Sequence, residues 1–126
     1  MNAIHRNGLR AVLGAAALVA VAAATTDTLN VPAIAVDATL SRTYRCQAGG
    51  SLNVTYFNSH DGQSFALLTV KDKAMLFVDT LAASGVKYQA GPYTWWTKGN
   101  RGDLYDTTAG PNAAPILAGC TSSPGR

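Results

Sequence analysis

The alternation of apolar and polar residues restricts the fold of this chain more than any other feature. From Leu40 onward the two kinds of side chain alternate with a period of two, as in Leu52, Val54 and Tyr56. This pattern, rich in β-branched and aromatic residues, is typical of β-strands. Turn-forming residues interrupt it roughly every eight to twelve residues, and no segment sustains the 3.6-residue period of a helix. The chain is therefore predicted to be all-β.

About eight strands are expected, a number that suffices for a barrel filled by side chains. They lie near residues 43–47, 52–57, 65–70, 74–78, 85–90, 93–98, 103–107 and 116–120. Lys71-Asp72-Lys73 joins the third and fourth as a tight hairpin. A small antiparallel sheet hides its edges by closing into a barrel or by packing as a sandwich. We expect a small eight-stranded antiparallel β-barrel.

The first 24 residues have the composition of an export signal. His5, Arg6 and Arg10 precede residues 11–24, an unbroken run of Ala, Val, Leu and Gly. The run has about the length of a signal-peptide hydrophobic region and is short for a bilayer span. Small residues favour cleavage after Ala24, with a second candidate after Ala35. A buried N-terminal helix is the alternative.

Beyond this signal, residues 25–39 are predicted to be a flexible arm, residues 40–120 the barrel domain, and residues 121–126 a polar tail. A lipoprotein anchor requires a cysteine directly after the hydrophobic run, and the first cysteine is Cys46. We therefore expect a soluble periplasmic or secreted protein without a membrane anchor.

Two cysteines in an exported chain indicate one disulfide. A bridge between Cys46 and Cys120 would join the start of the barrel to its end. Closing a loop of about 75 residues, it would stabilise the fold by roughly 4 kcal/mol in the chain-entropy model.

After cleavage His60 is the remaining histidine. Two thiols and one imidazole fall short of a structural zinc site, so neither a metal nor a cofactor is expected.

Charge and motif content argue against two common functions. Cleavage after Ala24 removes two of the ten basic residues, which leaves eight against seven aspartates and a net charge near +1. No Lys/Arg stripe indicates nucleic-acid binding. His60 is expected to be an exposed turn residue without a nucleophile motif, and most aspartates fall in predicted turns. Arg101-Gly102-Asp103 matches an integrin tripeptide but is expected to be a charged turn. The protein is not expected to be an enzyme.

Residues 84–99 combine two bends with a concentration of aromatic and basic side chains. One bend falls at Ser84-Gly85 and the second at Gly91-Pro92, after which the chain returns as a strand. Successive side chains of a strand point to opposite faces. One tryptophan of the Trp95-Trp96 pair is therefore expected to face the core, with the other outside near Lys98. Packing of both tryptophans inside the barrel is the alternative.

A set of short motifs follows in order along residues 42–120: Tyr44-x-Cys46, Ser84-Gly85-x-x-Tyr88, Trp96-Thr97-Lys98-Gly99, Leu104 and Cys120. Their order and spacing resemble the MliC/PliC family, the membrane-bound or periplasmic inhibitors of c-type lysozyme of Gram-negative bacteria. The resemblance implies an eight-stranded antiparallel barrel with a disulfide. It also implies a loop that enters the active-site cleft of lysozyme.

Carried over residue by residue, the resemblance implies that Ser84 and Lys98 contact the catalytic carboxyl groups of lysozyme. Gly85 and Tyr88 belong to the same binding motif. Further residues are implied as supporting members: Val86, Lys87, Tyr93 and Trp96. This chain departs from the family pattern at Thr94, four residues before the lysine, where the family has a tyrosine. Tyr93 precedes it by one position and is expected to face the other way.

The leading hypothesis is an exported, periplasmic inhibitor of c-type lysozyme. A near-neutral mature chain would not be attracted over long range to a basic lysozyme, so affinity would come from the local fit of the inserted loop. The alternative hypothesis is an exported barrel that binds a small apolar ligand, with Trp95 or Trp96 in its mouth.

Overall fold

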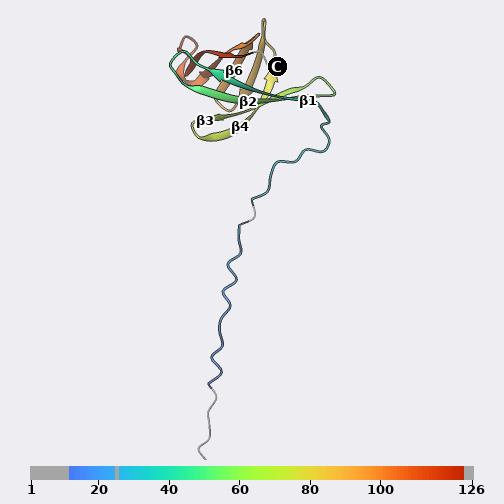
Figure 1. Ribbon diagram of the computed structural model, residues 1–126, viewed down its shortest axis with the longest axis vertical. Helices are drawn as coiled ribbons and strands as arrows, with labels where there is room; N and C mark the ends of the chain where they lie inside the picture. The colour runs from blue at the N-terminus through green and yellow to red at the C-terminus, as the bar shows by residue number, and fades with distance from the viewer. Residues whose placement is uncertain (1–11, 25, 124–126) are drawn as a thin grey trace, which may run out of the picture. The chain divides into compact units, whose positions relative to one another are not determined.

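The computed structural model describes residues 12–24 and 26–123 (Figure 1). The chain divides into two units, Met1–Asn30 and Val31–Arg126. The described residues of the first unit are exposed and lie in neither helix nor strand. No helix in the described ranges is long and apolar enough to cross a bilayer. Much of the expected signal peptide, residues 1–11, lies outside the described residues, as does residue 25, which would follow the first cleavage site.

The second unit is a closed barrel of eight antiparallel strands, each paired with its neighbours in sequence (Figure 1). This confirms the predicted fold class. The strands are β1 (Val36–Arg45), β2 (Ser51–Ser59), β3 (Ser64–Val70), β4 (Lys73–Thr80), β5 (Val86–Ala90), β6 (Tyr93–Lys98), β7 (Arg101–Asp106) and β8 (Leu117–Ser122). In such a meander the β2–β3, β4–β5 and β6–β7 connections lie at one end of the barrel, and the β1–β2, β3–β4 and β5–β6 connections at the other.

Some boundaries differ from the sequence-based prediction because residues outside the predicted strands also join the sheet. β1 begins at Val36, inside the expected arm, since it pairs with β2 as far as Ser59. β8 ends at Ser122, inside the expected tail. The tripeptide predicted as a turn, Arg101-Gly102-Asp103, instead begins β7, because Lys98 pairs with Arg101 across a two-residue connection.

The expected hairpin between β3 and β4 is confirmed. Its two turn residues, Lys71 and Asp72, have φ of 49° and 64°, and they connect the paired residues Val70 and Lys73. Positive φ at both central positions is the type I′ geometry, whose twist matches that of the flanking strands. Tight connections of this kind keep consecutive strands side by side, so the barrel follows the order of the sequence.

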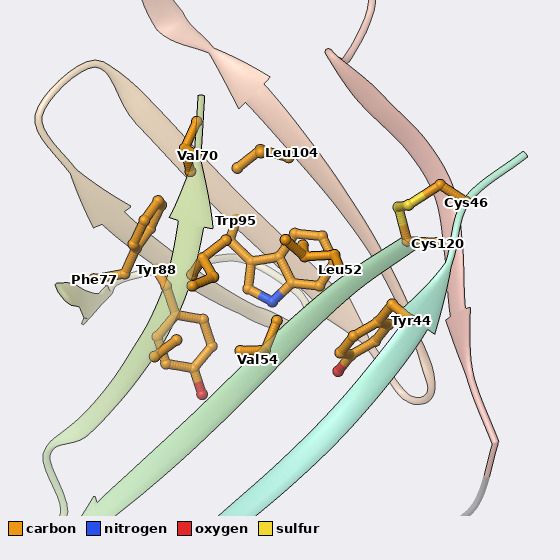
Figure 2. Close-up of a cluster of buried hydrophobic side chains, with 12 residues drawn as sticks. Tyr44, Cys46, Leu52, Val54, Val70, Phe77, Tyr88, Trp95, Leu104 and Cys120 are labelled. Atoms are coloured by element: carbon orange, nitrogen blue, oxygen red, sulfur yellow. A yellow bond between two sulfur atoms is a disulfide. The ribbon is translucent and has the colours of Figure 1, made fainter. Parts of the chain in front are cut away.

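Side chains fill the interior of the barrel (Figure 2). Trp95 and Phe77 are fully buried, and the Trp95 ring meets Tyr44 edge-to-face with centroids 5.0 Å apart. The Trp95 indole N–H donates to the Tyr56 hydroxyl at 2.9 Å, so its polar group is satisfied inside the core. A Cβ on Gly102 would overlap the Trp95 ring. One tryptophan of the pair thus faces the core, as predicted.

Cys46 and Cys120 form the predicted disulfide, which appears beside the core in Figure 2. It lies next to the seam where the barrel closes. Along this seam β1 pairs with β8 at Tyr44–Ser122 and Arg45–Thr121, whereas its pairing with β2 runs along most of the strand. The covalent bond therefore reinforces the shortest strand pairing of the barrel.

Removal of the disulfide should lower the free energy of unfolding substantially. The bridge spans 74 residues, and in the chain-entropy model loss of such a constraint on the unfolded chain costs about 4 kcal/mol. The double variant Cys46→Ala plus Cys120→Ala is compared with the wild type by urea denaturation. Reduction of the wild type by a thiol reagent should produce the same loss, and an unchanged midpoint would contradict the prediction.

The hydroxyl groups inside the barrel should make stability fall at alkaline pH. Burial, followed by the hydrogen bond with Tyr44, raises the pKa of Tyr56, and burial raises that of Tyr88. A tyrosine with a raised folded-state pKa contributes stability that is present below about pH 10 and is lost as the pH rises further. Urea denaturation between about pH 8 and 11 should show this decline. Tyr56→Phe should flatten it, even if the variant is less stable at every pH.

Candidate functional site

The β4–β5 connection, residues 81–85, is fastened to the outer face of β6. The indole N–H of Trp96 donates to the Ser84 carbonyl oxygen at 2.8 Å. Directly after the connection, Val86 pairs with Thr97, and the Thr97 hydroxyl donates to the Val86 carbonyl oxygen at 3.4 Å. Ser84 and Gly85 remain exposed. The loop therefore offers an open surface while its backbone is held by a neighbouring strand.

Gly85 allows the loop backbone to lie directly against β6. Its φ is +66°, in the left-handed region that favours glycine. A Cβ at this position would overlap the Thr97 carbonyl oxygen and lie 2.7 Å from Cγ of Lys98. Both the conformation and the close approach therefore require glycine, which the Ser-Gly motif supplies.

Two basic side chains form cation–π contacts with the Trp96 ring beside the loop. Lys87 Nζ lies 4.1 Å and Lys98 Nζ 4.6 Å from the centroid of its ring. At a surface site each cation–π contact is worth about 0.5–1 kcal/mol. Trp96 and Lys98 share the outer face of β6, so the prediction that the second tryptophan lies outside near Lys98 is confirmed. One indole ring holds the Ser84 backbone through its N–H and both lysines through its π-face.

The structure separates two predicted residues from this group. Tyr88 is buried in the barrel, where its hydroxyl hydrogen-bonds Oγ of Ser64 at 3.1 Å. Tyr93 packs against the core and faces away from Lys98, as expected for its position. Val86 is partly exposed at the end of the loop. Tyr88 and Tyr93 thus position β5 and β6 from inside. The Ser84-Gly85 loop meets the side chains of residues 87, 96 and 98 on the outer surface.

Sequence reasoning did not single out Tyr105, on the outer face of β7. Tyr105 pairs with Thr94 of β6. It lines one hollow of about 360 Å³ together with Lys87 and Trp96, and another of about 330 Å³ with Trp96 and Lys98. A tyrosine side chain therefore does lie beside Thr94, but it comes from the neighbouring strand. The alternation within β7 could have indicated its face, whereas the pairing register could not be obtained from the sequence.

The hypothesis of an apolar ligand in the barrel mouth finds little support. Trp95 is fully buried in the packed interior, and Trp96 lies on the outer surface. The hollow at the end of the barrel, about 380 Å³, is lined largely by polar residues, among them Arg42, Tyr56 and Tyr88. Within residues 12–24 and 26–123, no group of three or more His, Cys, Asp or Glu side chains could hold a metal ion.

Comparison with known proteins finds relatives of this chain. Two relatives, from Cupriavidus necator and Pseudomonas aeruginosa, carry the name membrane-bound lysozyme inhibitor of C-type lysozyme. The first is 47% identical over 81 residues (64% of this chain and 64% of the relative). The second is 42% identical over 80 residues (63% and 62%). This chain therefore spans under two thirds of the length of either relative.

Two solved structures share the fold. Pseudomonas aeruginosa MliC, in complex with hen egg white lysozyme, matches with a TM-score of 0.62 and 33% identity, over 80% of this chain and 99% of that chain. PliC-St, a periplasmic lysozyme inhibitor from Salmonella typhimurium, matches with a TM-score of 0.58 and 19% identity, over 68% and 98%. The family model described as membrane-bound lysozyme-inhibitor of c-type lysozyme matches residues 44–113. Since this match covers more than half of the sequence, the chain belongs to the MliC family.

Proposed function

We propose that this protein inhibits a c-type lysozyme by placing the loop at Ser84 and Gly85 in the active-site cleft of that enzyme. Membership of the MliC family and the likeness to an inhibitor solved with hen egg white lysozyme support the proposal. The observation that carries it is the hydrogen bond from Trp96 to the Ser84 carbonyl oxygen. Through this bond an exposed loop is held in one position next to Lys98.

The chemistry of the loop suits a cleft that contains two carboxyl groups. Lysozyme keeps one of them protonated, through a raised pKa, and the other ionised. A serine hydroxyl both donates and accepts hydrogen bonds. Ser84 would donate to the ionised carboxylate and accept from the protonated acid, and the Lys98 ammonium would form a charge-assisted bond with the carboxylate. These contacts occupy the groups that act on the substrate and need no catalysis by the inhibitor.

The anchoring of the loop reduces the cost of binding. Ordering a flexible segment on association consumes part of the interaction free energy, so a segment ordered beforehand binds more tightly. Here Gly85 lies against β6, and Trp96 holds the backbone of Ser84. The Ser84 carbonyl oxygen already has a donor, so its burial in a cleft leaves no unsatisfied acceptor at that point. The site is therefore suited to inhibition by insertion.

We also infer that the protein acts in the periplasm, and that it is not an enzyme because its named relatives are lysozyme inhibitors. The hydrophobic run of residues 11–24 fits an export signal, and a disulfide forms in oxidising compartments. Both cysteines of the sequence belong to that disulfide, so neither offers a thiol for lipid attachment. The periplasm is also where an inhibitor would protect the cell-wall polymer from lysozyme.

Purified protein should inhibit a c-type lysozyme in a cell-wall turbidity assay, and Ser84→Ala plus Lys98→Ala should weaken inhibition by about 100-fold or more. This size is expected because loss of a buried charge partner at an interface costs about 2–5 kcal/mol. Absence of inhibition by the wild type at micromolar concentration would refute the proposed function. Undiminished inhibition by the double variant would refute the site.

A matched control is available at the opposite end of the barrel. Ser51 begins β2 and Lys73 begins β4, and both side chains are exposed. Ser51→Ala plus Lys73→Ala removes the same chemical groups and the same charge as the site variant. It should inhibit lysozyme as well as the wild type does. A similar loss in both double variants would point to net charge as the cause.

Gly85→Ala should weaken inhibition by about tenfold or more, because the loop would have to move away from β6 and would lose its ordered position. Gly49→Ala is the control. Gly49 also has a positive φ, +90°, but no atom beyond its two chain neighbours lies within 4 Å of the position of a Cβ there. It belongs to the β1–β2 connection, at the opposite end of the barrel. Each variant carries left-handed strain of about 1–3 kcal/mol, so equal inhibition by the two would contradict a role for the packed loop.

A further inference from the structure

Leu81 opens the β4–β5 connection, and its side chain is 98% exposed. The other large apolar residues that the described part of the second unit exposes, residues 31, 36, 40, 67, 76, 86 and 116, are 38–46% exposed. Single exposed leucines are ordinary on protein surfaces, so exposure alone assigns no role. The location of Leu81 is what distinguishes it, since it lies three residues before Ser84 in the same connection.

The composition of the β4–β5 connection suits burial in an interface with another protein. No charged residue lies between Asp79 and Lys87, and the intervening residues are Thr80, Leu81, two alanines, Ser84, Gly85 and Val86. Burial of a charge without a partner is costly, whereas burial of apolar surface is favourable. Val86, at the far end of the connection, is also 40% exposed. Apolar side chains thus flank the serine on both sides.

We propose that Leu81 is an apolar anchor that packs against the wall of the lysozyme cleft when the Ser84 loop enters it. This inference rests on the proposed function and adds a contact outside the recognised motif. The protonated acid of lysozyme owes its raised pKa to apolar surroundings. Three residues of extended chain reach at most about 11 Å, so a serine that meets this acid brings Leu81 to the apolar surface nearby.

The test compares three variants with the wild type in inhibition of hen egg white lysozyme. Leu81→Ser removes the apolar side chain, and Leu81→Met keeps a similar volume and polarity. Leu76→Ser is the control, because Leu76 is 39% exposed on β4, away from the connection. Leu81→Ser should raise the inhibition constant about 10- to 100-fold, the range expected when a leucine loses its burial. Leu81→Met and Leu76→Ser should stay close to the wild type.

A second measurement separates an apolar contact from a change in the loop. Burial of apolar surface makes the heat capacity of binding more negative. Isothermal titration at several temperatures should therefore give a less negative value for Leu81→Ser than for the wild type. Circular dichroism and urea midpoints of Leu81→Ser should match those of the wild type, because the side chain makes almost no contact within the fold.

The outcomes distinguish this inference from the function on which it rests. Inhibition by the wild type together with a weak Leu81→Ser and an active Leu81→Met supports the anchor. Equal inhibition by the wild type and Leu81→Ser overturns the anchor and leaves the proposed function intact, as does an equal loss in Leu81→Ser and Leu76→Ser. Absence of inhibition by the wild type overturns both.

Discussion

The packing of Trp95 against Gly102 inside the barrel is the contact on which the rest of the structure depends. It fixes β6 against β7, because the ring fills the space that a Cβ on Gly102 would occupy. Successive residues of a strand face opposite sides, so a buried Trp95 places Trp96 and Lys98 outside. Two consecutive residues of β6 therefore have different roles. Trp95 packs in the core and fixes the position of the strand, whereas Trp96 contacts the Ser84 loop and the two lysines on the surface.

The site gains its order from few contacts. The Trp96 indole bonds the Ser84 carbonyl oxygen and lies beside two lysine ammonium groups, while Gly85 lets the loop backbone rest on β6. Individually these contacts are weak, since surface cation–π pairs and neutral hydrogen bonds contribute about 1 kcal/mol each. Together they hold the loop before any partner arrives. Its remaining surface, including Leu81 and the Ser84 hydroxyl, stays open to solvent.

Much of the fold could be predicted because it is encoded locally. The alternation in β2 and β6 and the tight turn at Lys71 and Asp72 each depend on a few neighbouring residues. β1 extends into the predicted arm because its first residues pair with the end of β2, which no local pattern specifies. The tripeptide that opens β7 was mispredicted because its glycine and charged residues resemble a turn, whereas Gly102 is buried against Trp95. The motifs identified Ser84, Gly85 and Lys98, and strand periodicity placed Trp96 outside. Tyr105 was missed because its approach to Thr94 depends on the register between β6 and β7, which no local pattern specifies. The binding roles of these residues remain predictions.

The disulfide at the β1–β8 seam makes the stability of the closed barrel depend on whether its surroundings are oxidising or reducing. A bridge of about 4 kcal/mol is a large share of the 5–15 kcal/mol that usually separates folded from unfolded domains. In a reducing compartment Cys46 and Cys120 stay as thiols, and the short seam must then close the barrel without covalent help. If the chain is exported as its N-terminal sequence predicts, a precursor without the disulfide would be easier to unfold for passage through a membrane pore. Oxidation would then stabilise the closed barrel only after export.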